Sequence, residues 1–392
     1  MPRSLLFNLT GHDRPGVTAA LFKALPSSTQ VLDVEQVVVD GLLTLAVLLE
    51  PAPDADIDAL AELVTQAVSP LGIQLTFVQA EGGATPTPSQ LLTVTVIGSP
   101  LTGAALSQLA ERVAQTGANI DRIERIAAYP VTALELSVSG AEVSALRKEL
   151  ASLSHDAGID IAVQSGGLAR RGRHLVVMDV DSTVIQDEVV ELLAAKAGVL
   201  ESVKAITDAA MRGELDFEAS LRERVALLAG LPSSVFDEAF AELTLTPGAR
   251  TLCRVLRSMD YQVALVSGGF SQVVEPLAEE LGVDFWEANL LEVEDGLLTG
   301  RILGEVVDRP GKARALARFA EASGIGLHRT IAIGDGANDL DMLQLAALGI
   351  AFNAKSVVQA SADAALNVPY LDSVLYFLGI TREEVEQLNA LG

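Results

Sequence analysis

The chain has few cysteines and few cationic side chains. Its 392 residues include a single cysteine, Cys253, which excludes an intrachain disulfide framework and any cysteine-rich zinc site. Lys and Arg number 27 against 52 Asp and Glu, so the formal net charge is −25. This acidic balance argues against unaided binding to a nucleic-acid backbone, which requires clustered Lys and Arg.

Long apolar runs are also missing. No apolar run approaches the ~18 residues needed to span a bilayer, and the apolar stretch near the N-terminus is too short for a secretory signal. We therefore expect a soluble cytoplasmic protein that acts on neither membranes nor nucleic acids. The hydrophobic share of 49% is ample for buried cores and excludes disorder as the dominant state.

Two stretches of unusual composition divide the chain. Residues 80–90 (AEGGATPTPSQ) and 164–173 (QSGGLARRGR) indicate linkers, because Gly and Pro are concentrated in the first and Gly and Arg in the second. They predict three domains, at 1–80, 90–165 and 174–392, and each has an ordinary domain size.

The sequence pattern of each of the first two domains predicts the element order βαββαβ. Alternating β-branched residues indicate strands, and apolar residues spaced by three and four indicate helices. The first domain has strands expected at 4–10, 29–38, 42–50 and 72–79, and helices at 15–25 and 55–69. The second has strands expected at 91–98, 118–127, 131–139 and 160–164, and helices at 102–115 and 141–154. This order predicts an antiparallel four-stranded sheet with two helices on one face, an α+β arrangement.

The third domain alternates strands and helices, as an α/β doubly wound parallel sheet does. Its buried strands are expected at 174–180, 261–267, 330–334 and 348–352. Polar residues begin where the first three strands end, and open α/β sheets bind their ligands beyond the carboxyl ends of strands. A helical insertion at about 187–245 follows the first strand, and we expect it to cover the site as a cap.

Two carboxylates, Asp179 and Asp181, stand two residues apart at the tip of the first of these strands. A pair of like charges ~4 Å apart costs on the order of 4 kcal/mol at an effective dielectric of about 20, so something must offset the repulsion. A divalent cation is the obvious candidate, and Mg²⁺ favours a few carboxylates together with water and substrate phosphate. Asp335, at another strand end, can reach the same ion because the adjacent glycines allow a tight turn.

Four motifs in this order resemble those of the haloacid dehalogenase superfamily of phosphotransferases. They are DVDST at 179–183, Ser267 in VSGG, Lys312, and GDGAND at 334–339. Each motif alone could be a turn or a helix cap. All four together, at fitting spacing, are a specific signal.

The resemblance implies a role for each motif residue. Asp179 would attack phosphorus and form an aspartyl-phosphate. Asp181, with a raised pKa, would protonate the leaving alkoxide and then deprotonate water. Mg²⁺ would be held by Asp179, Asp335 and the main-chain carbonyl of Asp181. The remaining roles concern the phosphoryl group: Ser267, the amide of Gly268 and Lys312 would bind its oxygens, Asn338 would orient Lys312 or the substrate, and Asp339 would support the site from behind.

The insertion resembles the small helical cap of the phosphoserine phosphatase family. The matching stretches are 181–194 (DSTVIQDEVVELLA) and 211–228 (MRGELDFEASLRERVALL). The resemblance implies that Glu188 pairs with the substrate ammonium and that Arg224 grips its carboxylate. Met211 and Phe217 would form an apolar wall over the substrate. Considered alone, Glu188 could equally be a first-turn helix residue and Arg224 a surface ion pair.

The resemblance therefore implies a Mg²⁺-dependent phosphatase that hydrolyses O-phospho-L-serine to L-serine and phosphate, the last step of serine biosynthesis. A phosphatase for another small phosphomonoester, such as homoserine phosphate, is the alternative with the same fold. A third possibility is an amino-acid-sensing regulatory protein whose phosphatase core is inactive, although the complete set of acidic residues argues against it.

The first two domains resemble ACT domains, small modules that often bind amino acids. In TGHDRPGV (10–17), Asp13 and Gly16 lie between a strand and a helix whose N-terminal amides suit a carboxylate. The second domain departs from this pattern, and Gly103 is its corresponding candidate. An effector such as serine is one interpretation, and the other is that both domains only dimerise the enzyme. In either case we expect a homodimer.

Overall fold

A computed structural model of the chain describes residues 4–80, 91–167, 170, 172, 174–211 and 215–391. Two compact units, Met1–Thr87 and Pro88–Gly392, are each described by themselves. Most of the linker expected at 80–90 and the side chain of Met211 lie outside the described part of the chain. Within that part, no helix combines the length and the apolar character needed to cross a membrane.

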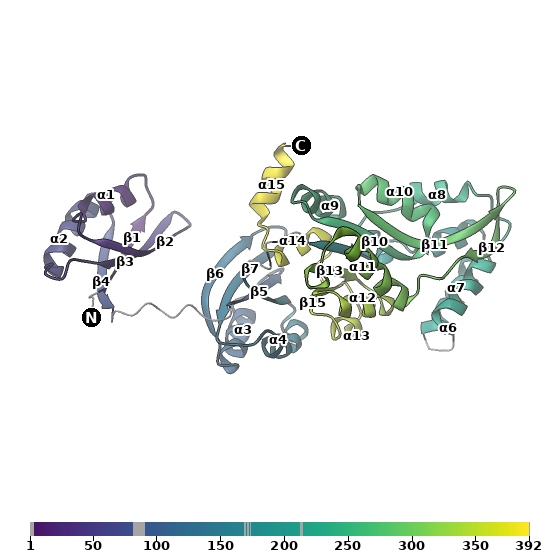
Figure 1. The fold of residues 1–392 in the computed structure, drawn as a ribbon, viewed down its shortest axis with the longest axis horizontal. Coiled ribbons are helices and arrows are strands. Elements are labelled where there is room, and N and C mark those ends of the chain that lie inside the picture. The colour runs from purple at the N-terminus through teal and green to yellow at the C-terminus, as the bar shows by residue number, and fades with distance from the viewer. Residues whose placement is uncertain are drawn as a thin grey trace. The chain divides into compact units, whose positions relative to one another are not determined.

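The first unit is a four-stranded antiparallel sheet with two helices (Figure 1). Its elements are β1 (Ser4–His12), α1 (Val17–Ala24), β2 (Gln30–Val39), β3 (Leu42–Glu50), α2 (Ile57–Val68) and β4 (Gln74–Ala80), with strand order β2-β3-β1-β4. Alternate side chains of β1 and β3, such as Phe7 and Leu45, are fully buried, because a strand sends successive side chains to opposite faces. They pack against apolar helix residues that include Leu21 and Val64.

The second unit begins with another module of the same element order. Its elements are β5 (Leu91–Gly98), α3 (Gly103–Gln115), β6 (Asn119–Ala127), β7 (Thr132–Ser139), α4 (Val143–Ala157) and β8 (Asp160–Ser165). Leu109 of α3 and Leu146 of α4 pack on the side chains of β5 that share one face, such as Val94 and Val96. The α+β architecture expected for both N-terminal modules is confirmed.

The sheet of this module continues into the third segment of the chain. Strand β8 pairs antiparallel with β15 (Ala364–Leu366) at Ala162 and Ala364. The resulting sheet has 11 strands in the order β12-β11-β10-β9-β13-β14-β15-β8-β5-β7-β6. The remaining strands are β9 (Leu175–Met178), β10 (Gln262–Phe270), β11 (Phe285–Glu294), β12 (Leu297–Leu303), β13 (Thr330–Gly334) and β14 (Leu348–Phe352). The second and third segments, separated in the sequence analysis, thus form one compact unit.

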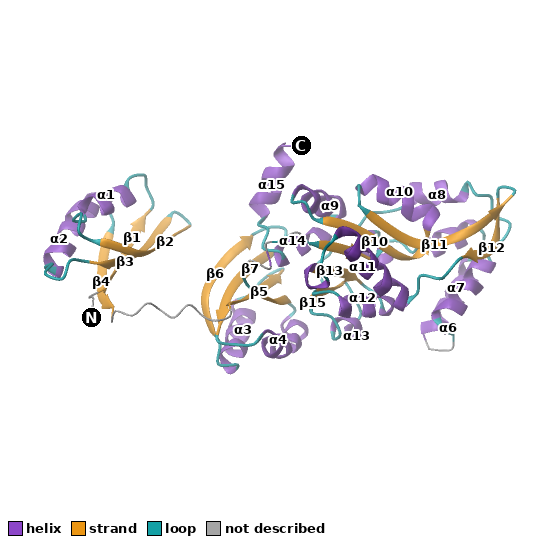
Figure 2. Cartoon of the chain, in the orientation of Figure 1, coloured by secondary structure: helices purple, strands orange, loops and turns teal. Residues whose placement is uncertain are grey.

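Helices cover both faces of the parallel part of this sheet (Figure 2). The helices around it are α9 (Ala249–Ser258), α10 (Ser271–Leu281), α11 (Arg309–Ser323), α12 (Leu340–Leu345), α13 (Ser356–Gln359), α14 (Val374–Phe377) and α15 (Arg382–Leu391). Val176 and Met178 of β9 pack in the same cluster as α9 and α10, whereas Leu175 and Val177 pack with α11 and α12. The predicted doubly wound fold is confirmed.

A group of four helices follows β9. They are α5 (Val189–Lys196), α6 (Leu200–Met211), α7 (Phe217–Ala226) and α8 (Val235–Glu242). The chain enters this group after a short turn, Val180–Val184, and returns to the sheet before α9. This insertion, expected at about 187–245, supplies one wall of the cavity described below.

Candidate active site

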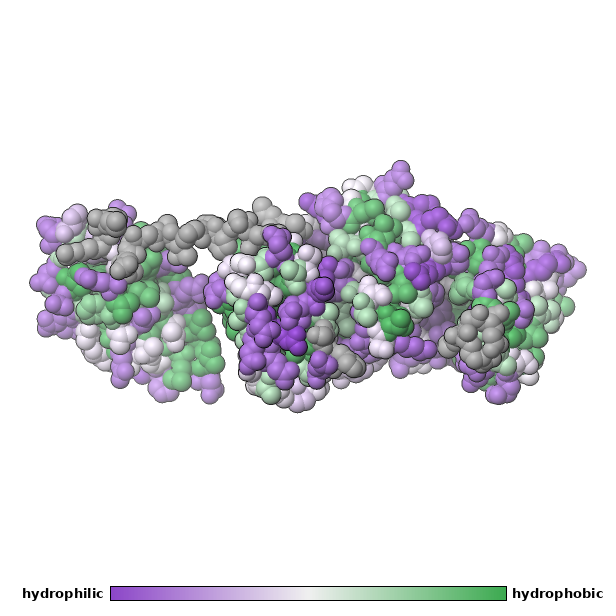
Figure 3. Space-filling model, turned by 90° about the horizontal axis from the view of Figure 1, so that it is seen from below, coloured by the Kyte–Doolittle hydropathy of each residue, from purple (hydrophilic) through white to green (hydrophobic). Residues whose placement is uncertain are grey.

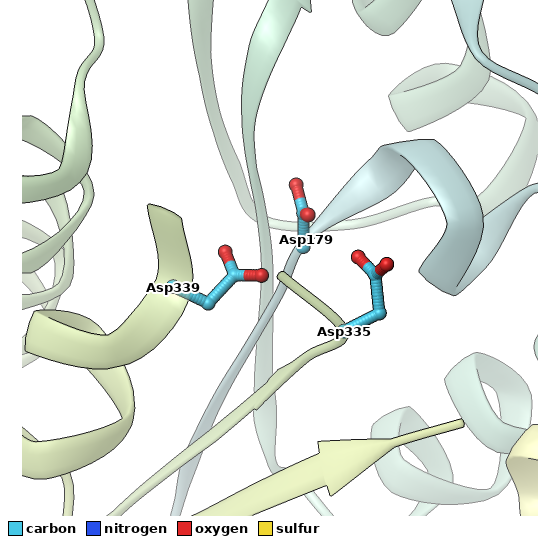
Figure 4. Close-up of side chains that lie close together, drawn as sticks. All are labelled: Asp179, Asp335 and Asp339. Carbon is cyan, nitrogen blue, oxygen red and sulfur yellow. The ribbon is translucent and has the colours of Figure 1, made fainter. Parts of the chain in front are cut away.

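Three carboxylates lie close together at the carboxyl ends of β9 and β13 (Figure 4). These strands are parallel neighbours, so Asp179 after β9 and Asp335 after β13 meet at one edge of the sheet. The N–H of Asp179 donates to the carbonyl of Ile333 at 2.9 Å and ties the two strand ends together. One carboxylate oxygen from each of Asp179, Asp335 and Asp339 lies within 4.8 Å of the other two.

A fully buried lysine joins two of these carboxylates. Lys312, in the first turn of α11, donates from Nζ to Asp179 Oδ1 at 2.6 Å and to Asp339 Oδ1 at 2.7 Å. Burial alone would lower the pKa of Lys312, but the two carboxylates raise it above its ordinary value. The lysine therefore stays charged inside the protein.

Asp339 is held from both of its oxygens. Its Oδ1 accepts from Lys312, and its Oδ2 accepts from the N–H of Gly336 at 2.9 Å. Gly334 allows this close packing, because a Cβ at that position would lie 2.4 Å from Asp339 Cγ. Asp339 is thus a fully buried anchor for Lys312.

The site carries more negative than positive charge. Burial, and then the neighbouring Asp339, raise the pKa of Asp179 well above its ordinary range and that of Asp335 to about 6. One lysine among these carboxylates leaves an excess of anionic oxygen. Clustered carboxylate oxygens are the ligands that hard divalent cations prefer, so the donor set fits a divalent metal ion.

Asp181 faces the same cavity from the turn after β9. Its Oδ1 accepts from the N–H of Val189 at 2.8 Å, and its Oδ2 accepts from the hydroxyl of Ser267 at 2.9 Å. Ser267 Oγ also accepts from the N–H of Gly269 at 2.7 Å. Burial raises the pKa of Asp181 above its ordinary value despite these hydrogen bonds.

A cavity of about 480 Å³ connects the carboxylates to the helical insertion. The predicted residues that line it are Asp179, Asp181, Glu188, Phe217, Arg224, Gly268, Asp335 and Asn338. Phe217 lies against Gly268, since a Cβ on that glycine would be 3.1 Å from Phe217 Cζ. Ser267 and Lys312 are buried and donate to the lining carboxylates Asp181 and Asp179, and the buried Asp339 accepts from Lys312.

Glu188 is fixed by a residue that the sequence analysis did not single out. Ser182 Oγ donates to Glu188 Oε1 at 2.9 Å. Ser182 has a φ of 57°, in the left-handed region, which a serine reaches only where the surrounding structure demands it. Burial, and then the nearby Asp181, raise the pKa of Glu188 to about 7.

Arg224, on α7, also lines the cavity. Its Nε donates to the carbonyl of Ser220 at 3.3 Å, and its Nη1 lies 3.5 Å from Thr207 Oγ1. Burial lowers its pKa and Glu188 opposes this effect, as expected when both face one cavity. No motif in the sequence marks Thr207, because its role depends on the packing of α6 against α7.

The second wall of the cavity was also absent from the sequence analysis. Asn353, Lys355, Val357 and Val358 line it from the segment after β14. Asn353 has a left-handed φ of 46°. A strand end followed by Asn is a weak signal that could have pointed here.

The ACT-like candidates belong to the two N-terminal modules. Asp13 and Gly16 belong to the first unit, where Gly16 has a φ of 98° and caps α1. Gly103 belongs to the second unit, as the first residue of α3 after the cap Thr102.

Comparison with known proteins covers almost the entire chain. A model of the haloacid dehalogenase-like hydrolases matches residues 176–344, and models of ACT domains match residues 3–78 and 92–164. The chain is 55% identical over 390 residues to the phosphoserine phosphatase of Streptomyces coelicolor, with 99% of this chain and 95% of the relative covered. The chain belongs to the phosphoserine phosphatase family.

Other members of this family support the assignment. The phosphoserine phosphatase SerB2 of Mycobacterium tuberculosis is 49% identical over 391 residues, which cover 99% of this chain and 96% of that protein. A solved substrate-bound phosphoserine phosphatase complex matches 53% of this chain and 98% of its own, with 42% identity and a TM-score of 0.51. The predictions of a haloacid dehalogenase-like phosphatase with tandem ACT domains, and of an enzyme, are confirmed.

Proposed function

We propose that this phosphatase hydrolyses O-phospho-L-serine to L-serine and phosphate, with Mg²⁺ bound and with Asp179 transiently phosphorylated. The proposal rests on one observation: a single cavity holds one group of residues suited to a metal and a phosphoryl group and another group suited to an amino acid. Carboxylates and Lys312 at its base suit a metal and a phosphoryl group, and Glu188 and Arg224 on its wall suit a zwitterion. A solved relative described as a phospho-aspartyl intermediate analogue of phosphoserine phosphatase, 42% identical, agrees with the covalent route.

The base of the cavity orients the nucleophile. Lys312 Nζ and the N–H of Val180 both donate to Asp179 Oδ1. Oδ2 of Asp179 accepts neither of these hydrogen bonds, so we assign it as the atom that attacks phosphorus. It forms a bond to phosphorus while the bond from phosphorus to the serine oxygen breaks. Asp179, Asp335 and the main-chain carbonyl of Asp181 would hold Mg²⁺, which neutralises phosphate charge when bound.

Asp181 moves the proton in both half-reactions. Its raised pKa lets it carry a proton, which it gives to the serine oxygen as that group leaves. The resulting carboxylate then takes a proton from the water that attacks the phosphorus of the aspartyl-phosphate. Phosphate leaves, and both carboxyl groups return to their starting states. Ser267, through its hydrogen bond to Oδ2, keeps Asp181 directed into the cavity.

Phosphate binding and substrate selection use different groups. Ser267, the amide of Gly268 and Lys312 would bind the phosphoryl oxygens, with Asn338 beside them and Asp339 holding Lys312. Glu188 would receive the substrate ammonium and Arg224 its carboxylate. Phe217 would cover the carbon skeleton, together with Met211, whose side chain the structure does not describe.

Steady-state kinetics with matched substrates test this proposal. We expect O-phospho-L-serine to be preferred over O-phosphoethanolamine, which lacks the carboxylate, and over homoserine phosphate, which is one carbon longer. Asp179→Asn should abolish both turnover and phosphoenzyme trapping. Asp341→Asn is the matched control, because Asp341 pairs with Arg309 on the surface. Full activity of Asp179→Asn, or full activity after removal of divalent metal, would contradict the proposal.

The ACT modules suggest regulation and dimerisation. We infer that L-serine binds near Asp13 and Gly16. Gly103 is the corresponding candidate in the second module, whose sequence departs from that of the first. Strand β2 supports a homodimer, because this edge strand is exposed along its whole length and carries apolar residues such as Val34 and Val38. Figure 3 shows exposed hydrophobic residues on the first unit.

Two measurements check the regulatory part of the proposal. Calorimetry of the full chain with L-serine should give heat of binding that Gly16→Val removes, since Gly16 has a left-handed φ. Light scattering should give the mass of a dimer. A monomer without serine binding would reduce the ACT modules to a structural role. We place the enzyme in the cytoplasm, at the last step of serine biosynthesis.

A further inference from the structure

A second cavity lies between the second ACT module and the phosphatase sheet. It has a volume of about 360 Å³, within the range typical of small-molecule sites. One wall is α4 and β8, and the other is α13 with the residues that lead into β15. It shares no lining residue with the active-site cavity, and neither Asp13, Gly16 nor Gly103 lines it.

The lining combines an ion pair with an apolar surface. Arg147 of α4 pairs through Nη1 with Asp363, and its Nη2 donates to the carbonyl of Val163 at 2.9 Å. Its Nε is buried and has no hydrogen-bond partner in the described part of the chain. The apolar lining is formed by Leu150, Ile161, Val163, Ala360, Ala362 and Ala364.

This combination suits one ligand class. A cation and an anion side by side complement a molecule that carries a carboxylate and an ammonium, which can enter between them. Such a zwitterion keeps the local charge balanced, whereas a lone carboxylate would leave Asp363 without its cation. The apolar lining accommodates an aliphatic side chain.

A chain of hydrogen bonds links this region to the active site. Asp160, at the start of β8, accepts from the N–H and the Nδ2 of Asn367, each at 2.8 Å. Gln359 Nε2 donates to Asn367 Oδ1 and to the carbonyl of Ala354, each at 2.7 Å. Gln359 lines the second cavity. The segment that it holds, 353–358, supplies the active-site wall.

Asp363 provides a second link. Its Oδ2 accepts from the N–H of Gly349 at 2.9 Å, at the start of β14. Strand β14 leads directly to Asn353 at the active-site cavity. A ligand that separates Arg147 from Asp363 therefore acts on the strand and on the segment that border the substrate.

We propose that this second cavity binds a small α-amino acid with an aliphatic side chain, and that binding changes the active site through the segment 353–359. The carboxylate of the ligand would pair with Arg147 and its ammonium with Asp363. The binding part stands on this cavity alone, whereas the coupling part rests on the proposed phosphatase function.

Calorimetry of the full chain with L-valine as the probe tests binding without any need for turnover. Three related compounds separate the contributions: 3-methylbutanoate lacks the ammonium, 2-methylpropylamine lacks the carboxylate, and glycine lacks the side chain. We expect L-valine to bind at least about tenfold more tightly than each of the three. A lack of heat with L-valine at millimolar concentrations, or equal binding of the three compounds, overturns the proposal.

Variants locate the bound ligand. Arg147→Met should weaken L-valine binding by at least about tenfold. Ala151→Leu, at an exposed position of α4 that lines the cavity, should weaken it by narrowing the space. Arg112→Met is the matched control, since Arg112 pairs with Glu149 on the same module and does not line the cavity. If Arg147→Met and Ala151→Leu both bind as the parent does, the ligand lies elsewhere and the proposal fails.

The coupling is tested by the KM for O-phospho-L-serine. Saturating L-valine should change this KM by at least about threefold in the parent chain. Asn367→Ala interrupts the hydrogen-bond chain without removing a lining residue, so it should still bind L-valine but show a smaller change in KM. An unchanged KM in the parent chain refutes the coupling. Absence of any phosphatase activity would instead refute the proposed function and leave the binding result intact.

Discussion

Replacement of Lys312 by methionine would test the electrostatics of the phosphatase core. Methionine keeps an unbranched side chain but removes the only cation that the structure places against Asp179 and Asp339 among the described side chains. All three side chains are almost completely buried, with exposures of 0%, 4% and 0% for Lys312, Asp179 and Asp339. Little water reaches these side chains, so two carboxylates would be left without their shared partner.

The expected cost is large. Removing one partner of a buried ion pair destabilises a protein by about 3–5 kcal/mol, because the remaining charge stays buried and unpaired. At roughly 2 °C per kcal/mol for a domain of this size, the midpoint of thermal unfolding should fall by about 6–10 °C. Lys204→Met is the control: Lys204 forms an exposed pair with Glu191 at 3.9 Å, and its loss should cost less than about 1 kcal/mol.

The loss of stability caused by Lys312→Met should depend on pH in a defined direction. Without Lys312, the pKa of Asp179 in the folded state rises further above its unfolded value, since the lysine is the cation that lowers it. A group with a raised folded-state pKa stabilises the protein at low pH and loses that contribution as pH rises. The deficit of Lys312→Met should therefore be greatest at alkaline pH and shrink as the solution is acidified.

The single tryptophan makes the assay specific to the phosphatase unit. Trp286 lies in β11 and packs against the core of that sheet, so its fluorescence follows the unfolding of this unit and not of the first. Thermal and urea unfolding should be compared at several pH values. One contradicting result is a fall in the free energy of unfolding of Lys312→Met by less than about 1 kcal/mol, and another is a fall that does not vary with pH. Either result would show that the buried carboxylates do not depend on Lys312 to balance their charge.

Three further predictions concern individual side chains. The pKa of Glu188, about 7, predicts that KM for a substrate with an ammonium rises as pH falls below about 7, and that Glu188→Gln flattens this dependence in a pH–KM profile. Ser182→Gly keeps the left-handed backbone but removes the hydroxyl that holds Glu188. It should raise KM for O-phospho-L-serine by about five- to twentyfold and leave p-nitrophenyl phosphate unaffected; equal losses would refute a role in ammonium binding. Burial raises the pKa of Cys253 to about 12, so iodoacetamide should modify it only after unfolding, as mass spectrometry would show.

Much of the phosphatase fold could be predicted because the local sequence patterns and the parallel sheet topology indicate the same arrangement of strands. The apolar runs before Asp179 and Asp335 indicate buried strands, and parallel neighbours bring their ends to one edge. Two carboxylates separated by more than 150 positions in the sequence therefore become neighbours by topology alone. No side-chain detail is needed for that inference.

The detailed contacts of the site depend on backbone conformations that sequence patterns do not specify. Ser182 reaches Glu188 only because its backbone is left-handed, a conformation more common for Gly and Asn. Asn353 enters the cavity wall from a strand end whose only sequence signal, the Asn itself, is weak. Asp339, interpreted from the sequence as a supporting residue, also brings a carboxylate oxygen within 4.8 Å of the other two acids.

The junction of the second ACT module with the phosphatase sheet was the least predictable feature. It depends on β15, a strand of three residues that is too short to give a periodic signal. Its partner β8 differs from β4, the last strand of the first module: Ala162 and Val163 are buried, whereas much of β4 is exposed. Both faces of β8 are covered, because Ala162 joins the large phosphatase core while Ile161 and Val163 pack under the helices of the module. A strand buried on both faces cannot shift without disturbing two cores, so any ligand that moves β8 must also act on the phosphatase sheet.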